Sequence, residues 1–173
     1  ATLDDHVSVK AFGAKGDNST ADVLAIQRAL DELYSDTDQD DARARRVLFF
    51  PAGQYNITAE IKIPPYAHLV GEGQDKTILY RTGSGDNLAV TVDNAGNGHG
   101  SIGSGSAVTP KNISIEGITF KQGTAKVGLS IDSTTNLYAR NCKWQGTYAS
   151  GGADASGSKA VSNNSTTALP STN

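Results

Sequence analysis

Two stretches of this sequence, "NISIEGITF" (112–120) and "NLYARNCKW" (136–144), align without a gap at an offset of 24 residues. In both stretches apolar residues alternate, Gly117 or Asn141 interrupts them, and the alternation resumes with an aromatic residue. Gly and Asn tolerate the left-handed conformation that turns a corner between strands. The repeat therefore predicts two successive pairs of short strands. The aligned positions are Asn112 with Asn136 (a predicted stacked amide pair), Ile113 with Leu137, Ile115 with Ala139, Gly117 with Asn141, Ile118 with Cys142 and Phe120 with Trp144.

A second repeat supports the same period. Residues 90–93, "VTVD", match residues 129–132, "LSID", at an offset of 39 residues, and the Gly/Ser-rich stretch 94–108 lies between them. Without that insertion, the offset is close to the period of the first repeat. A period of this length, built from strands and corners with no helix in each unit, indicates a parallel β-solenoid.

The only strong helix signal lies in residues 19–34, "STADVLAIQRALDELY". Its apolar residues recur at spacings of three and four and form one stripe, which consists of Val23, Ile26, Leu30 and Leu33. We expect Ser19 or Thr20 to cap the helix and Asp22 to lie in its positively polarised first turn. Because a solenoid exposes unpaired strand edges at its ends, we expect this helix to cover the first coil.

The sequence divides into four predicted parts. They are a lead-in strand and turn (1–18), a capping helix (19–34), β-helical coils (47–148) with an insertion at 94–108, and a flexible tail or linker to further sequence (149–173). The last part is rich in Gly, Ser and Asn and has little to bury. A strand that another chain completes is the alternative for it.

Composition excludes several classes of function. The chain has 173 residues and a formal net charge of −3, which offers no basic face to nucleic acid. No apolar run is long enough to cross a bilayer, so we expect no membrane insertion. The single cysteine, Cys142, excludes an internal disulfide, and we expect it to pack as a small apolar side chain.

The opening "VSVKAFGAKGDNSTADVLAIQRALDE", followed by "VLFFPAGQYNIT" and "HLVGEG", resembles the start of the pectate-lyase-like right-handed parallel β-helix superfamily. The resemblance covers residues 7–146 and is more specific for the fold than for an activity. It implies an all-β, right-handed parallel β-helix with one N-terminal amphipathic capping helix. The sequence is most similar to the N-terminal part of bacteriophage tailspike and tail-associated proteins. This similarity implies a homotrimer, other virion proteins as partners, and a location in the phage tail or outside the cell.

Two acids at strand ends, Asp93 and Asp132, are the candidate catalytic residues. If the second repeat is in register they lie one coil apart, and neighbouring strands are separated by ~4.8 Å. Carboxylates at that separation suit a retaining glycosidase or a cation site. The alternative, which we favour, is that both are turn acids that face solvent. We therefore expect no catalytic centre in this segment and no cofactor, with Ca²⁺ expected only if the chain is a lyase.

Three other side chains give weaker signals. The Gly-His-Gly triplet around His99 is similar to one in polygalacturonases, but the adjacent Asp pair and the later Arg-x-Lys of that family are missing here. We therefore interpret His99 as a loop residue. Tyr138 and Trp144 suit stacking on sugar rings if they face outward, but the alignment of Trp144 with Phe120 favours the interior.

Three functions remain. The first is a structural and attachment module of a phage tailspike-like virion appendage, a β-helical rod that presents a surface to host polysaccharide. The second is a polysaccharide-degrading enzyme, namely a lyase, a glycosidase or an epimerase. The third is the N-terminal fragment of such an enzyme. We favour the first because the sequence offers no convincing set of carboxylates or basic residues over several coils.

Overall fold

The computed structural model describes residues 6–34, 46–83, 85–93, 110–123, 125–131, 134–146 and 159–163. Its helical elements are the short 3-10 helix η2 (Val9–Phe12) and the α-helix α1 (Val23–Tyr34). Its strands are β1 (His6–Ser8), β2 (Asp17–Ala21), β3 (Val47–Phe50), β4 (Gly53–Ile57), β5 (Ile61–Ile63), β6 (His68–Gly71), β7 (Thr77–Arg81), β8 (Asn87–Thr91), β9 (Lys111–Glu116), β10 (Thr119–Lys121), β11 (Val127–Ile131), β12 (Thr135–Arg140), β13 (Lys143–Gln145) and β14 (Lys159–Asn163).

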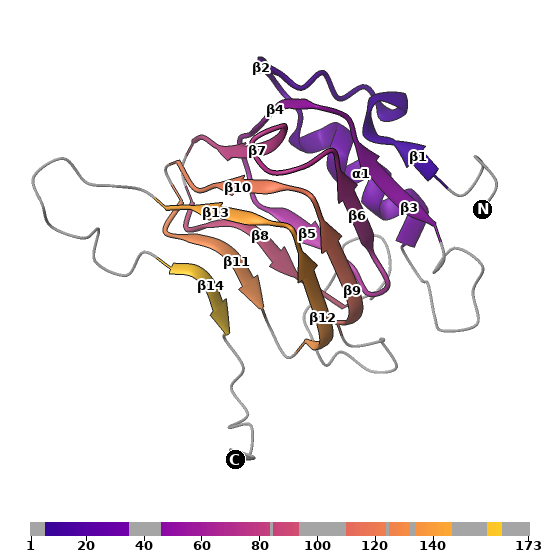
Figure 1. Ribbon diagram of the computed structural model, residues 1–173, viewed down its shortest axis with the longest axis vertical. Helices are drawn as coiled ribbons and strands as arrows, with labels where there is room; N and C mark the ends of the chain where they lie inside the picture. Colours follow the sequence, from indigo (N-terminus) through magenta and orange to yellow (C-terminus); the bar gives the residue numbers. More distant parts are fainter. Residues whose placement is uncertain are drawn as a thin grey trace, which may run out of the picture.

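The strands form three parallel sheets. The first sheet has the order β1-β3-β6-β9-β12, the second β2-β4-β7-β10-β13, and the third β5-β8-β11-β14. From β3 onward, consecutive strands belong to the first, second and third sheet in turn. Figure 1 shows a stack whose colours run from indigo, at the end with β1 and α1, to yellow at β14. The prediction of a mostly β chain with parallel strands and one α-helix is confirmed.

The first sequence repeat is confirmed as a strand register. Phe120 of β10 lies beside Trp144 of β13, and their rings stack with centroids 5.3 Å apart. The side-chain amide of Asn136 donates a hydrogen bond of 3.1 Å to Oδ1 of Asn112, which is the predicted amide pair. Both Asn residues have positive φ, of 58° and 53°, as a left-handed position requires.

The second repeat is shifted by one residue from its predicted alignment. The prediction set Val90 against Leu129, but Val90 of β8 lies beside Ser130 of β11, and Leu129 lies beside Ala89. Because successive side chains of a strand point to opposite faces, a slip of one residue exchanges inward and outward positions. The insertion at 94–108, which had to be removed to align the two stretches, lies outside the described residues.

Helix α1 begins at Val23 rather than at Ser19. Residues 17–21 form β2 instead, because they pair in parallel with β4. Ser19 and Thr20 therefore do not cap the helix. Their backbone N–H groups donate to Oδ1 of Asp17, over 3.0 and 2.7 Å. These hydrogen bonds, with that from the Thr20 backbone the strongest cause, lower the pKa of Asp17 to about 2.

Asp22 is buried immediately before the helix, not exposed in its first turn. Its carboxylate accepts hydrogen bonds from the backbone N–H groups of Lys15, over 2.7 Å, and Gly16, over 3.0 Å. The acid thus ties the turn that follows η2 to the start of α1. This contact explains why a Gly-rich turn and an acid precede the helix in the sequence.

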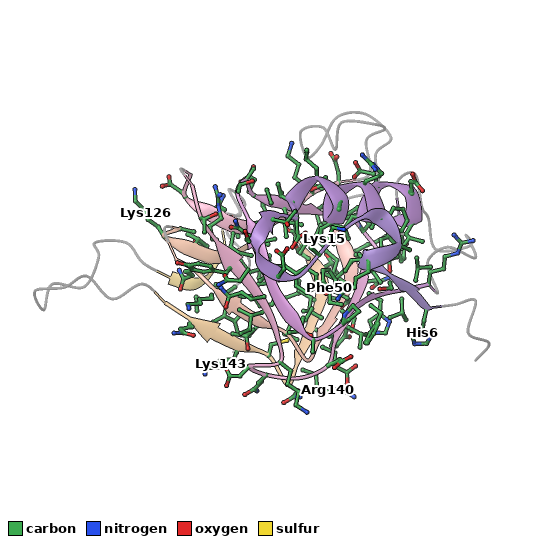
Figure 2. The ribbon with its side chains drawn as sticks, turned by 90° about the horizontal axis from the view of Figure 1, so that it is seen from above. His6, Lys15, Phe50, Lys126, Arg140 and Lys143 are labelled. Carbon is green, nitrogen blue, oxygen red and sulfur yellow. The ribbon has the colours of Figure 1, made fainter. Side chains whose placement is uncertain are left out.

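The apolar stripe of α1 faces the core. Ile26 and Leu30 are fully buried, and the helix contacts η2, β3, β4 and β5. Beneath the helix, inward side chains of the three sheets form one continuous apolar cluster. Figure 2 shows the side chains of this interior, with Phe50 of β3 among them.

A short strand lies inside the range 149–173, which the sequence predicts as a tail or linker. This strand, β14, pairs in parallel with β11 and places Val161 beside Leu129. The rest of that range lies outside the described residues.

Candidate functional site

Of the two candidate carboxylates, the structure describes only Asp93. This residue follows β8 and is fully buried, so it does not face solvent as a turn acid. Asp132 lies outside the described residues, and the proximity of the two acids stays a prediction. The register of β8 and β11 differs by one residue from the alignment that set the acids side by side. Within the described ranges, no group of three or more His, Cys, Asp or Glu side chains could hold a metal ion.

The outer surface of the second sheet carries a row of polar and aromatic side chains. We call Asn56, Tyr80, Lys121 and Gln145 the second-sheet row. They are neighbours in register on β4, β7, β10 and β13. The row faces outward because the adjacent residues of the same strands, such as Leu79, are buried in the core.

Two contacts hold the row in place. The ammonium nitrogen of Lys121 lies 4.7 Å from the centroid of the Tyr80 ring, within the range of a cation–π interaction. The hydroxyl of Thr82 donates to Oδ1 of Asn56 over 2.5 Å. The aromatic ring, the ammonium group and the amide are therefore positioned next to one another before any ligand arrives.

A polar loop between β6 and β7 borders the row. The carboxylate of Asp75 accepts hydrogen bonds from the Lys143 ammonium, over 3.0 and 3.1 Å. The side-chain amide of Gln74 donates to Oδ1 of Asn141 over 3.3 Å. All four side chains are on the surface, and Figure 2 shows Lys143 on the outside of the stack. The loop thus extends the polar surface beyond the row.

The chemistry of this surface is that of binding. Amide groups donate and accept hydrogen bonds, an ammonium group attracts anions, and a tyrosine ring offers a flat apolar area. Such a combination suits a polyhydroxylated ligand, and especially one that carries negative charge.

The other singled-out residues lie elsewhere. Trp144 stacks almost parallel on Phe120, at an interplanar angle of 7°, which confirms the prediction that it packs inside. Tyr138, on the first sheet, is 64% exposed. Cys142 packs against the core as expected, and burial raises the pKa of its thiol. His99 lies outside the described residues.

The second-sheet row was not predicted from the sequence. Its residues come from coils of unequal length, so that no fixed offset connects Tyr80 with Lys121. The available signal was the alternation in "TILYR" (77–81), which sets Ile78 and Tyr80 on one face of a strand.

A model of the family described as "Rhamnogalacturonase A/epimerase, pectate lyase-like" matches residues 6–156, which is most of the chain. The chain belongs to this family. The match confirms the resemblance inferred from the opening segments. The family includes proteins with different activities, so membership does not assign a reaction to the chain.

Individual relatives differ in kind. The preneck appendage protein of Bacillus phage PZA is 27% identical over 140 residues, which cover 78% of this chain and 15% of that protein. A probable glucan endo-1,3-beta-glucosidase of Arthroderma benhamiae is 41% identical over 71 residues, which cover 41% of this chain and 7% of that protein. The chain of this pectate lyase-like protein therefore spans only a small part of the length of these relatives.

Solved structures support the fold. ORF18 of Geobacillus virus E2 superimposes with a TM-score of 0.65 at 24% identity, covering 80% of this chain and 25% of that chain. An N-terminal fragment of bacteriophage phi29 gene product 12 has a TM-score of 0.57 at 24% identity, covering 79% of this chain and 21% of that chain. Among the described residues, no helix is long and apolar enough to span a membrane.

Proposed function

We propose that this chain is a structural and attachment module of a phage-type virion appendage, a rod of stacked coils that presents its polar outer surface to host polysaccharide. The observation that carries this proposal is the similarity to phage preneck appendage proteins, which extends over 78% of the chain. The relatives with enzyme names match shorter stretches of it. In this function the chain is located in the virion or outside the cell, and other virion proteins are its partners.

In this proposal, the three sheets close into a right-handed parallel β-helix, and α1 caps its first coil. The rotation of consecutive strands through the three sheets supports a closed coil. The contacts of α1 with β3, β4 and β5, the first strands after the helix, support the capping role. A stiff rod of this kind positions a binding surface at a fixed distance from its attachment point, and the rods associate as a homotrimer.

The binding surface in this proposal is the second-sheet row. Its Lys121 ammonium and Tyr80 ring, in contact at 4.7 Å, favour a sugar chain that carries carboxylate, sulfate or phosphate groups. Because such contacts are partly electrostatic, we expect the binding to weaken as the salt concentration rises.

The test is a binding titration with polysaccharides of known charge. Dextran sulfate and unsubstituted dextran share a backbone, so their comparison isolates the effect of the anionic groups. We expect the chain to bind the sulfated polymer and Lys121→Ala to weaken that binding about 10-fold, the loss of one charge-assisted contact. The matched control is Lys126→Ala, which removes an equal charge from an exposed ion pair with Asp86. Equal effects of the two substitutions, or no binding at all, would contradict the assignment of this surface.

The second candidate function is degradation of an acidic or neutral polysaccharide by a lyase, a glycosidase or an epimerase. The observations that favour it are the family itself and the burial of Asp93, since burial raises carboxyl pKa values in many catalytic acids. Under a lyase mechanism, Ca²⁺ is the cation expected beside the acids Asp93 and Asp132. Release of reducing or unsaturated ends from a polysaccharide, abolished in Asp93→Asn with folding intact, would replace the attachment function with this one.

A further inference from the structure

The first sheet has an outer surface of a different kind from the second. Phe49 of β3 lies beside Val70 of β6, and both are half-buried on the outer side of the sheet. They face outward because their neighbours Leu48 and Leu69 point into the core, where they are almost completely buried. Two adjacent apolar side chains therefore lie on the outside of the stack.

Charged and aromatic side chains continue this surface along the stack. Val70 lies beside Glu116 of β9, and Glu116 lies beside Arg140 of β12. Figure 2 shows Arg140 on the outside of the stack. Tyr138, two residues before Arg140 on the same side of β12, is 64% exposed. We call Phe49, Val70, Glu116, Tyr138 and Arg140 the first-sheet face.

The composition of the first-sheet face is that of a protein contact. Aromatic residues and Arg are enriched where proteins meet, and Lys is depleted. The second-sheet row, by contrast, is built from amides and a lysine. A flat surface with an apolar pair at one end and an exposed tyrosine at the other fits another folded surface better than a flexible polar chain.

The charges of this face point to a second copy of the chain as the partner. Glu116 and Arg140 bring one acid and one base to adjacent strands, so the face is self-complementary in charge. Rotation of one copy against another sets the Arg140 of one opposite the Glu116 of the other. Because the whole chain carries a net charge of −3, contact through a face with balanced charges also limits repulsion between copies.

We propose that the first-sheet face is the surface through which copies of this chain contact one another, with Phe49 and Val70 buried at the contact and Glu116 paired with Arg140 across it. The inference deepens the proposed function, because it rests on the association of the rods and assigns that association to one sheet. It leaves the second-sheet row on a separate surface, free to bind polysaccharide.

The first test compares two aliphatic side chains that differ in the sheet they belong to. Val70 and Ile78 are both half-buried on outer surfaces, of the first and the second sheet respectively. Sedimentation equilibrium of the 173-residue chain is expected to show self-association, weakened at least ~10-fold by Val70→Glu and left within about twofold by Ile78→Glu. Circular dichroism and thermal unfolding establish that both variants are folded. A wild-type chain that stays monomeric, or equal effects of the two substitutions, would overturn the proposal.

The second test separates a contact between copies from one within a copy. Glu116→Arg and Arg140→Glu each place like charges on the face, and each variant alone is expected to associate at least ~10-fold more weakly than the wild type. An equimolar mixture of the two restores opposite charges between unlike copies only, so we expect the mixture to associate again. A mixture that stays dissociated, with both variants folded, would overturn the pairing across copies.

The outcomes also separate this inference from the proposed function. Binding of dextran sulfate, measured per chain on the Val70→Glu variant, reports on the second-sheet row alone. Retained binding by a dissociated variant supports both proposals. Self-association without polysaccharide binding supports the contact and removes the attachment function, whereas binding by a wild-type monomer does the reverse.

Discussion

The two ends of the strand stack differ in how their inward side chains are covered. In the third sheet, Ile61, Ala89, Leu129 and Val161 occupy equivalent positions on successive strands. The first three are at most 2% exposed, but Val161, on β14, is 42% exposed. At the other end α1 lies against β5, and its Leu30 is fully buried. The same kind of position is therefore buried or exposed according to what lies on the next layer.

The helical end also satisfies backbone groups that a neighbouring strand would otherwise pair. The side-chain amide of Gln27 donates to the carbonyl oxygen of Lys62 over 3.0 Å and accepts from its N–H over 2.9 Å. One side chain thus makes the two hydrogen bonds that a strand would offer at this point of β5. The comparison teaches that closing a parallel stack requires both apolar cover and hydrogen-bond partners, because a buried unpaired backbone group is costly.

The largest effect is expected from Leu30→Ala in α1. The substitution removes a fully buried side chain between the helix and the first coils, so we expect the free energy of unfolding to fall by ~2–5 kcal/mol. Urea unfolding followed by circular dichroism measures it. Leu24, on the same helix but 77% exposed, gives the matched control, and Leu24→Ala is expected to change stability by less than ~0.5 kcal/mol. Equal losses in the two variants would mean that the helix does not cover the stack through its apolar stripe.

A smaller effect is expected from Gln27→Leu, which keeps the size of the side chain but removes both hydrogen bonds to Lys62. We expect a loss of ~1–2 kcal/mol, since two half-buried backbone groups lose their partners. Hydrogen exchange localises the effect: the amide of Lys62 is expected to exchange faster. The amide of Val92, which donates to the carbonyl of Ile63 instead, serves as the internal control. Unchanged exchange at Lys62 would show that another group satisfies this edge.

The sequence predicts the covered end better than the outer surfaces. The stripe of α1 follows from spacing alone, because a helix has a fixed period. Its start does not, since the pairing of 17–21 with β4 overrides the local capping preference of Ser19 and Thr20. The stacked pair of Asn112 and Asn136 was predictable because the two coils have the same length.

Registers between coils of unequal length escape the same reasoning. The alignment of Val90 with Leu129 was wrong by one residue, since nothing local counts the residues of a loop between two strands. For the same reason the sequence did not predict that Tyr80 lies beside Lys121. The fate of Asp93 was also missed: an acid that follows a strand reads as a turn residue, and only the packing of distant segments buries it.

The smallest effect is expected at the opposite end, from Val161→Ala. Val161 occupies the same ladder position as Leu129 but is 42% exposed, so its truncation removes little buried area. We expect a loss below ~0.5 kcal/mol, against ~2–5 kcal/mol for Leu129→Ala, both measured by urea unfolding.

The contrast between Val161 and Leu129 is informative in either direction. If Val161→Ala costs as much as Leu129→Ala, the inward side of β14 is covered in solution by a further layer, and the difference between the two ends disappears. Such a layer has to come from another strand or another copy, because exposed apolar positions along a parallel edge gain most from pairing with one more strand. A concentration-dependent loss would then assign the cover to a second copy, and a concentration-independent loss would assign it to the same chain.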